Sequence, residues 1–435
     1  MHTSSDVQTR TATTARECPE CSAPLPADGQ YVQWCASCDW NVDPGAPDPE
    51  PGRIAAARRR LAHRYGQELA GEMEGAGLAR PGRDAASVLA LTLSMFVHGL
   101  TVFLAVAGIL LVVLGWNSGA QPIIGALLLA IAAVLRPRFG RLPKDALVLH
   151  RADAPKLFEL IDEVGVVAGT TGVDTVVVDA KANAAVTTYG LRRRRVLFLG
   201  LALWEMLTPQ ERMALLGHEL GHFAHGDLRH GMVTSSALRS LHLWLYFLAP
   251  SEAEGMMDRF VNAIVFLPRC LVLGTLTVLD HLTLRASQRA EYLADASAAR
   301  AGSTEAAVAL MDRLLVCDSA ESALQRESVA AGMRGGAAGR EAKELAEQHL
   351  WERLAERMRA VPAHEYERLR RVSARRGHSV DDTHPPTHLR RRCAAAGGPH
   401  PAGVVWDDER LAAVADELAP ARTQLARMVI RDYAG

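Results

Sequence analysis

The hydropathy pattern of the chain is dominated by one long uncharged stretch, because no Asp, Glu, Lys or Arg occurs from Ala86 to Leu135. Two apolar blocks lie in this stretch on either side of the polar turn "NSGAQP", and the second block is short for a membrane span. A helix of ~20 apolar residues crosses a hydrocarbon layer of ~30 Å. The pattern therefore predicts a transmembrane helical hairpin over 86–136, with a buried hairpin in a soluble protein as the alternative.

Arginines flank this hairpin on both sides, whereas its turn carries no charge. Lys and Arg are enriched at the cytoplasmic ends of membrane helices, and the polar N-terminal sequence lacks the apolar core of a cleavable signal peptide. We therefore expect a multi-pass protein of the cell membrane whose N-terminus faces the cytoplasm. The Arg- and Ala-rich, Lys-poor composition is typical of a GC-rich bacterial genome and so indicates a bacterial inner membrane. The flanking residues are Arg80, Arg83, Arg136, Arg138 and Arg141.

A second apolar pair, 231–250 and 260–284, has a weaker pattern. Arg239, Arg269 and Asp280 fall within it, and a charge at mid-bilayer is costly. The acidic segment between the two halves suits a loop on the outer side of the membrane. We predict two more membrane helices here; helices that pack on the first hairpin or lie at the interface are the alternatives.

Between the two apolar pairs the pattern is that of a small soluble domain. "DTVVVD", "NAAVTTYG" and "RVLFLG" predict short strands between 174 and 200, after a helix that begins near 154. The next helix is predicted to begin at Thr208, with Glu211 three residues later, as in a capping box. After 285 the chain is predicted to be soluble and mostly helical.

Four of the seven cysteines form two C-x-x-C pairs near the N-terminus, Cys18 with Cys21 and Cys35 with Cys38. Each pair can form a tight knuckle, and two knuckles complete a closed tetrahedral zinc site that stabilises a module too small for its own core. A redox pair or a chance pattern is the alternative. The other cysteines are isolated, so a disulfide framework is not indicated.

These features predict a mainly α (α+β) fold, namely a membrane-anchored domain with a small antiparallel sheet and an N-terminal zinc ribbon. The net charge of −1 and the pI near 7 argue against a nucleic-acid partner. The expected segments are a tail (1–17), the ribbon (18–42), a linker and basic juxtamembrane helix (43–85), the hairpin (86–136), the first part of the soluble domain (137–228), the second apolar pair (229–285), and the second part of the soluble domain (286–435).

The stretch "HELGH" (218–222) carries the clearest chemistry. Positions i and i+4 share one face of a helix, so His218 and His222 can bind one metal ion. Glu219 can take a proton from a water at that ion and return it to the leaving amine. The alternative is an ordinary helix with two exposed histidines.

A third ligand must come from elsewhere in the chain. The extended metalloprotease motif requires Gly at 225 and His at 228, but the chain has His225 and Leu228. Further on, "EYLAD" places Glu291 and Asp295 at i and i+4 of a predicted helix. Glu291 can complete a set of two histidines and one glutamate that leaves a position for water, and Asp295 can accept the far N–H of a ligand histidine. A surface carboxylate is the alternative for Glu291.

Together with "THPPTHLR" (383–390) and Asn183-Ala184, these motifs resemble the HtpX and CaaX-prenyl-endopeptidase family of integral-membrane zinc peptidases of the gluzincin type. The resemblance covers roughly 86–395. It implies a zincin-like metallopeptidase domain in which a catalytic Zn²⁺ is bound by His218, His222 and Glu291, and Glu219 is the general base.

The resemblance also implies roles for residues outside "HELGH". His384 would stabilise the oxyanion, with His388 as a second candidate, and Arg390 would anchor that loop or contact the active-site carboxylates. Asn183 and Ala184 would open an edge strand that pairs with the substrate. The family tends to have Phe where this chain has Ala185, and the N-terminal ribbon is an addition to the family plan.

The function expected from the resemblance is a membrane-bound zinc endopeptidase whose active site faces the cytoplasm and which cleaves membrane or misfolded proteins. It would hold one catalytic and one structural Zn²⁺, and its partners would be a protein or peptide substrate and the lipid bilayer. A CaaX-type prenyl-protein endopeptidase is one alternative. A non-catalytic membrane adaptor that recruits a protein partner through the ribbon is another.

Overall fold

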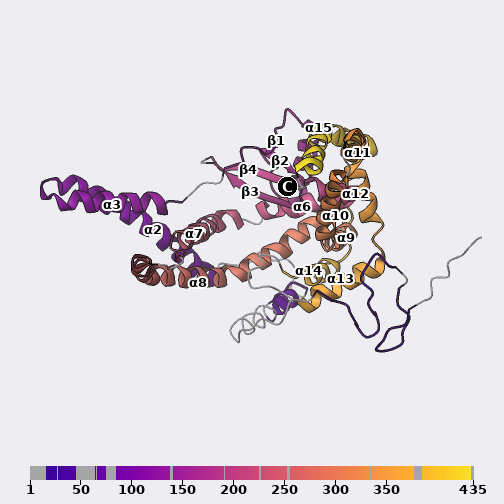
Figure 1. Cartoon of the computed structure of the whole chain (residues 1–435), viewed down its shortest axis with the longest axis horizontal. Helices are drawn as coiled ribbons and strands as arrows, with labels where there is room; N and C mark the ends of the chain where they lie inside the picture. Colours follow the sequence, from indigo (N-terminus) through magenta and orange to yellow (C-terminus); the bar gives the residue numbers. More distant parts are fainter. Residues whose placement is uncertain are drawn as a thin grey trace, which may run out of the picture.

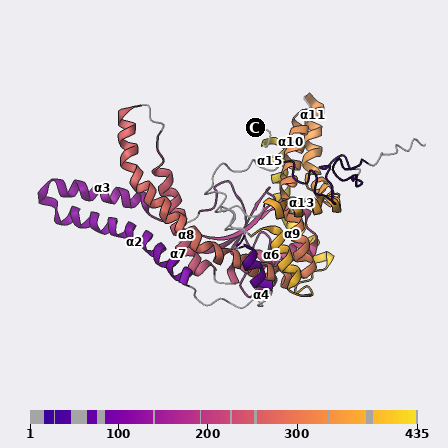
Figure 2. The same cartoon turned by 90° about the horizontal axis from the view of Figure 1, so that it is seen from below.

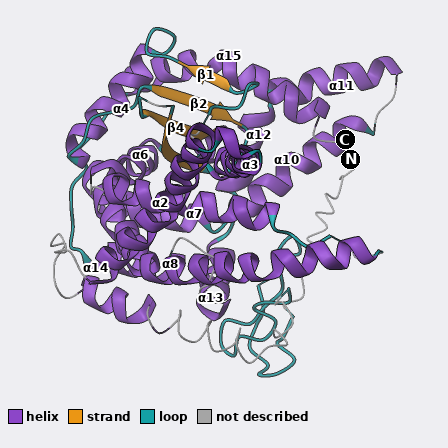
Figure 3. Cartoon of the chain, turned by 90° about the vertical axis from the view of Figure 1, so that its left-hand side faces the viewer, coloured by secondary structure: helices purple, strands orange, loops and turns teal. Residues whose placement is uncertain are grey.

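The computed structural model describes residues 16–26, 28–45, 64, 66–74, 85–137, 141–190, 192–224, 227–251, 255–333, 336–376 and 385–432. Most of these residues are helical, and a small sheet lies among the helices (Figures 1 and 3), so the predicted fold class is confirmed. The sheet consists of β1 (Leu147–Leu149), β2 (Thr175–Asp179), β3 (Ala184–Tyr189) and β4 (Arg194–Gly200). The helices are α2 (Ala85–Leu114), α3 (Ala120–Leu135), α4 (Pro155–Ala168), α5 (Leu201–Met206), α6 (Pro209–Ala224), α7 (Asp227–Phe247), α8 (Met256–Gly302), α9 (Thr304–Leu314), α10 (Cys317–Gly332), α11 (Gly336–Gln348), α12 (Leu350–Arg359), α13 (Ala363–Arg376), α14 (Thr387–Ala396) and α15 (Asp408–Asp432), with a short 3₁₀ helix η1 (Trp116–Ser118) between α2 and α3.

The sheet has the order β1-β2-β4-β3 and is mixed rather than antiparallel throughout. The expected antiparallel pairing holds for β1 with β2 and for β3 with β4, but β2 and β4 run parallel. The reason lies at Gly200, where the chain after β2 crosses the end of β4. The Gly200 N–H donates to the Asn183 carbonyl at 2.9 Å, and a Cβ at Gly200 would lie 2.1 Å from the Lys181 carbonyl oxygen. This close crossing carries β3 to the far edge of the sheet.

The main core lies where α4, α6, the C-terminal part of α8 and the helices after it meet the sheet. The last helix, α15, closes this core by folding back onto α4 and α10. The Glu417 carboxylate accepts the backbone N–H groups of Lys156 and Leu157 at 2.8 and 2.9 Å. Those N–H groups lie in the first turn of α4, where no helical carbonyl is available to them. The final helix, whose role the sequence leaves open, therefore stabilises α4 and the core.

Helices α2 and α3 form the predicted hairpin, and Figures 1 and 2 show it projecting from the body of the molecule. Gly108 and Gly125 let the two helices approach closely, because a Cβ at Gly108 would lie 2.9 Å from the Gly125 carbonyl oxygen. Large apolar side chains such as Phe96 and Phe103 are exposed on α2, by 68% and 66%. An apolar surface of this kind is unfavourable in water and favourable in lipid.

Two of the described helices, α2 and α8, are long and apolar enough to cross a membrane, judged by length and composition. Helix α7, the first half of the predicted second pair, packs between them: Ala237, Leu241 and Trp244 are buried against α2 and α8. Helix α8 is one continuous element of 47 residues. Its first half exposes apolar side chains, and its second half enters the core of the soluble domain.

Candidate metal centre

The centre is built where α6 crosses α8, at a seam of small residues. A Cβ at Gly217 would lie 2.7 Å from the Ala301 Cβ, and a Cβ at Gly221 would lie 3.0 Å from the Ala294 Cα. Only glycine at these two positions allows so close an approach of the helix backbones. The seam therefore brings "HELGH" on α6 directly beside Glu291 on α8.

The predicted capping box fixes the start of α6. The Thr208 N–H donates to the Glu211 carboxylate at 2.8 Å, and the Glu211 N–H faces the Thr208 hydroxyl at 3.4 Å. Helix α6 runs from there without interruption through both histidines. The predicted helix and its cap are confirmed.

His218, His222 and Glu291 converge, with all their ligand atoms within 4.8 Å of one another. The Nε2 atoms of the two histidines lie 3.3 Å apart. Each Nε2 lies 3.6 Å from one carboxylate oxygen of Glu291. In a tetrahedral zinc site with bonds of about 2.0–2.1 Å, neighbouring ligand atoms are about 3.3 Å apart. The donor set and its spacing therefore fit a zinc ion.

Asp295 holds His218 from behind. Its Oδ1 lies 2.9 Å from His218 Nδ1, so Nδ1 carries the proton and Nε2 presents its lone pair towards the other two donors. Arg390, on α14, in turn grips Asp295 through two hydrogen bonds of 2.6 and 2.9 Å. Its guanidinium also lies 3.5 Å from the Glu291 carboxylate. The predicted contact of Arg390 with the carboxylates is thus present in the structure.

Asp295 and Arg390 are both buried, with 2% and 5% of their surface exposed. Burial works to raise the pKa of Asp295, but the charge and hydrogen bonds of Arg390 outweigh it and hold that pKa well below its usual range. Burial likewise works to lower the pKa of Arg390, and the charge of Asp295 raises it. The pair therefore stays ionised, and Asp295 remains an acceptor for His218.

The other predicted site residues that the structure describes lie on α6, at β3 and on α14. Glu219 is buried between the two histidines on α6, with 6% of its surface exposed. Asn183 is exposed at the start of the edge strand β3, where its side chain accepts the Ala184 N–H at 2.9 Å. His388 is half-buried in the first turn of α14. His384 lies outside the described residues.

The four N-terminal cysteines form a second cluster, also within 4.8 Å. Cys18 lies 3.6 Å from Cys38, and Cys21 lies 3.5 Å from Cys35, measured between sulfur atoms. Sulfur atoms around a tetrahedral zinc ion with bonds of ~2.3 Å are about 3.8 Å apart. The backbone N–H of Cys38, together with that of Ser37 and against the effect of burial, lowers the pKa of the Cys35 thiol to about 6. The cluster fits a closed structural zinc site.

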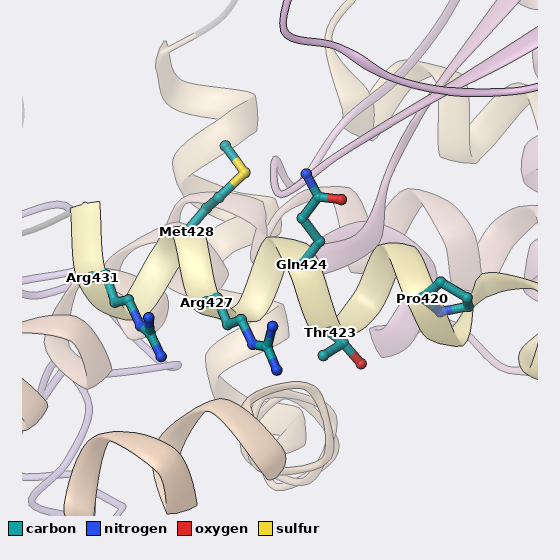
Figure 4. Close-up of a pocket in the computed structure, with 6 residues that line it drawn as sticks. All are labelled: Pro420, Thr423, Gln424, Arg427, Met428 and Arg431. Carbon is teal, nitrogen blue, oxygen red and sulfur yellow. The ribbon is translucent and has the colours of Figure 1, made fainter. Parts of the chain in front are cut away.

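A hollow of about 510 Å³ lies elsewhere, along α15 (Figure 4). It contains none of the predicted site residues and has no part in the metal centre. Its lining residues are Pro420, Thr423, Gln424, Arg427, Met428 and Arg431.

Sequence reasoning missed the elements that support the centre. The glycine spacing in "LGHELGH" (216–222) was a usable signal, because glycines four residues apart mark one face of a helix for close packing. The helical segment 66–74 lies within the predicted juxtamembrane helix, but no signal indicated its packing: it buries Leu69 and Ala70 against Tyr292 and Leu389, the neighbours of Glu291 and Arg390.

Comparison with known proteins gives one family. The model for peptidase family M48 matches residues 153–396, which is more than half of the chain and includes every predicted residue of the metal centre. No curated protein and no solved structure matches the chain.

Proposed function

Because the chain belongs to peptidase family M48, whose members are zinc-dependent, we propose that it is a membrane-anchored zinc endopeptidase that cleaves membrane or misfolded proteins. The observation that carries the proposal is the convergence of His218, His222 and Glu291 at the distances of a tetrahedral zinc site. A structural role alone would not require a general base beside them, and Glu219 supplies one.

His218, His222 and Glu291 would hold the zinc ion, which would supply Lewis acidity for a water and for the scissile carbonyl. Glu219 takes the proton of the attacking water and delivers it to the leaving amine. Asp295 keeps the proton of His218 on Nδ1, and Arg390 keeps Asp295 ionised. The family resemblance assigns the oxyanion contact to His384.

The substrate is proposed to bind as an extended strand. Strand β3 is at the edge of the sheet and packs against α6. Its outer edge can therefore pair with a peptide through main-chain hydrogen bonds and place it beside "HELGH". Asn183 and Ala184, at the start of β3, would be the first residues along this edge.

The membrane anchor sets where cleavage occurs. Val278 is 50% exposed towards the end of the apolar part of α8. Glu291 follows on the same helix at about 20 Å, given a rise of ~1.5 Å per residue. The centre would thus lie at most about 20 Å along α8 from its apolar part, on the proposed cytoplasmic side. This position favours loops and unfolded segments outside the bilayer over bonds within it.

The deciding experiment compares the wild-type protein with Glu219→Gln, both purified in detergent, by zinc content and by cleavage of casein and of the chain itself. We expect two zinc ions per chain in both, and a loss of at least ~100-fold in cleavage rate for the variant. Glu409→Gln, an exposed change of the same kind in the first turn of α15, is the matched control and should cleave normally.

Retained cleavage by Glu219→Gln would refute the mechanism. Two zinc ions per chain with no cleavage by any of the three proteins would favour the adaptor function instead. Selective cleavage of prenylated CaaX peptides by the wild-type protein would favour the prenyl-protein endopeptidase.

A further inference from the structure

The four-cysteine ribbon is docked on the peptidase domain rather than held apart from it. Trp34 is 1% exposed and packs with Val42 against Val372 of α13. The guanidinium of Arg371, also on α13, lies 5.0 Å from the centre of the Trp34 ring. The apolar face of the ribbon is therefore already covered by a helix of the same chain.

The second cysteine knuckle aims an acidic side chain at this helix. Asp39 directly follows Cys38 and has φ of 59°, a left-handed conformation that Asp tolerates better than most residues. Its N–H donates to the Cys35 carbonyl at 2.9 Å and closes the knuckle. The Asp39 carboxylate then accepts hydrogen bonds from Arg371 and Arg375 of α13 at 2.6 and 2.8 Å. The turn that gathers the cysteines thus also sets the contact with α13.

A buried polar contact and a second ion pair complete the interface. Arg368 of α13 is 9% exposed, forms two hydrogen bonds with Glu365, and donates to the Val42 carbonyl at 2.9 Å. Arg376 binds both oxygens of Asp43 at 2.7 and 2.8 Å. A single exposed ion pair contributes little, but here exposed and buried contacts act on one helix.

Helix α13 is linked to the metal centre through two adjacent residues of α9. Asp312 binds Arg370 of α13 at 2.8 Å and Arg391 of α14 at 3.1 Å. Arg391 is the neighbour of Arg390, which grips Asp295. Asp312 thereby ties the ribbon-bearing helix to the helix that supplies Arg390.

The next residue on α9 makes a second link. Arg313 donates to the Tyr366 hydroxyl of α13 at 2.8 Å and to the Glu211 carboxylate at 3.3 Å. Glu211 belongs to the capping box of α6, the helix of "HELGH". Helix α6, which carries "HELGH", and helix α14, which carries Arg390, are therefore both linked to α13.

We propose that the zinc ribbon is a metal-dependent positioning module of the peptidase centre, which acts by holding α13 and, through Asp312 and Arg313, the helices α14 and α6. The inference rests on the proposed peptidase function. It assigns the ribbon a partner within the same chain, namely the arginine-rich face of α13 with its apolar patch, in place of an external protein. Asp312 and Arg313 are positioning residues, since they act through Arg390 and α6.

The test uses the full chain in detergent and measures three quantities: zinc per chain, hydrogen exchange of the α13 and α14 amides, and kcat and KM for a casein-derived peptide. The docking variant is Asp39→Asn with Asp43→Asn, and the metal variant is Cys35→Ser with Cys38→Ser. Glu20→Gln, an exposed change in the first knuckle, is the control and should match the wild-type protein.

The docking variant should keep both zinc ions, exchange its α13 and α14 amides about 5-fold faster or more, and lose a similar factor in kcat with little change in KM. The metal variant should lose one zinc and show the same changes or larger ones. Asp312→Asn should leave exchange in the ribbon unchanged and accelerate exchange in α14, whereas Glu305→Gln, an exposed acidic change on the same helix, should not.

Unchanged exchange at α14 and an unchanged kcat in both ribbon variants would overturn the proposal, because the ribbon would then be undocked without effect on the centre. This result differs from a failure of the proposed function. If the wild-type protein cleaves nothing, the exchange at α14 still decides whether the ribbon and the centre are coupled.

Discussion

The two metal-ligand clusters of this protein are assembled in opposite ways. The cysteines lie between positions 18 and 38 and are gathered by two short turns, in which Ser22 and Asp39 take the same left-handed conformation, with φ of 60° and 59°. The proposed peptidase ligands, such as His218 and Glu291, are far apart in the chain and are gathered by the packing of α6 on α8. One site depends on local backbone geometry and the other on the tertiary fold.

The surroundings of the two clusters differ as well. Cys21 and Cys38 are exposed, and the four sulfur atoms leave no coordination position open. His218 and Glu291 are buried, with 6% and 4% exposed, and three donors leave a fourth position for water. A closed site of local turns suits a structural role, and an open, buried site backed by charged groups suits catalysis.

Removal of one proposed peptidase ligand should have the largest effect, and it should abolish zinc binding at one cluster while leaving the other unchanged. Glu291→Gln replaces a charged ligand by a weak neutral one, so we expect one zinc to be lost and cleavage to fall at least ~1,000-fold. Zinc titration and peptide hydrolysis measure both effects. The ribbon should keep its zinc, and loss of both ions together would show that the clusters are not independent.

Loss of the Asp295 carboxylate, which lies against His218, should have the next largest effect. Asp295→Asn keeps the shape of the side chain but removes the charge that fixes the His218 tautomer and pairs with Arg390. We expect the affinity of the peptidase zinc to fall by about 10- to 100-fold, with the ribbon zinc unaffected, as measured by competition with a chelator. An unchanged affinity would mean that the carboxylate does not orient His218.

The packing seam should show the smallest effect of the three. In Gly221→Ala, the added Cβ would lie 3.0 Å from both the Ala294 Cα and the Ser297 Cβ, so α6 and α8 must move apart. Such overpacking costs about 1–3 kcal/mol. We expect a lower melting temperature and a reduced kcat.

Gly71→Ala is the matched control for that variant. Gly71 lies in the helical segment 66–74, and a Cβ there would meet nothing within 4 Å. It should melt at the wild-type temperature or slightly above. Equal melting temperatures for Gly221→Ala and Gly71→Ala would show that the seam is not tight.

Much of the candidate site could be predicted from the sequence because its signals are local. The i, i+4 spacing in "HELGH" and in "EYLAD", the two C-x-x-C pairs and the capping box at Thr208 each depend on a few neighbouring residues. The uncharged stretch likewise predicted the hairpin α2–α3. The family resemblance, drawn from "HELGH", "EYLAD", "THPPTHLR" and Asn183-Ala184, is confirmed by the match to peptidase family M48.

The rest depends on contacts between distant parts of the chain. The parallel pairing of β2 and β4 follows from a crossing at Gly200 that no periodicity encodes. Strand β1, with only three residues, is too short to give a pattern. The arginines of α13 have the spacing of an ordinary solvated helix face, and only the fold reveals their acidic partners in the ribbon.

The run Arg390 to Arg392 illustrates this limit. Consecutive positions on a helix point about 100° apart, and these three side chains reach three different partners: Asp295 on α8, Asp312 on α9 and Glu74 in the segment 66–74. A run of like charges in the sequence is therefore three separate contacts in the fold.

Because α8 is one continuous helix, the side chains of its apolar half and those at the metal centre keep a fixed angle to one another about the helix axis. Leu276 and Leu279 face α2 and α7, and further along the same rod Glu291 and Ala294 face α6. Inserting or deleting one residue between Leu279 and Glu291 would turn one set by about 100° relative to the other and shift it by ~1.5 Å. A loop absorbs such a change in length, but this helix cannot. One count of residues therefore sets both the direction in which the apolar half of α8 faces and the direction in which the Glu291 carboxylate points.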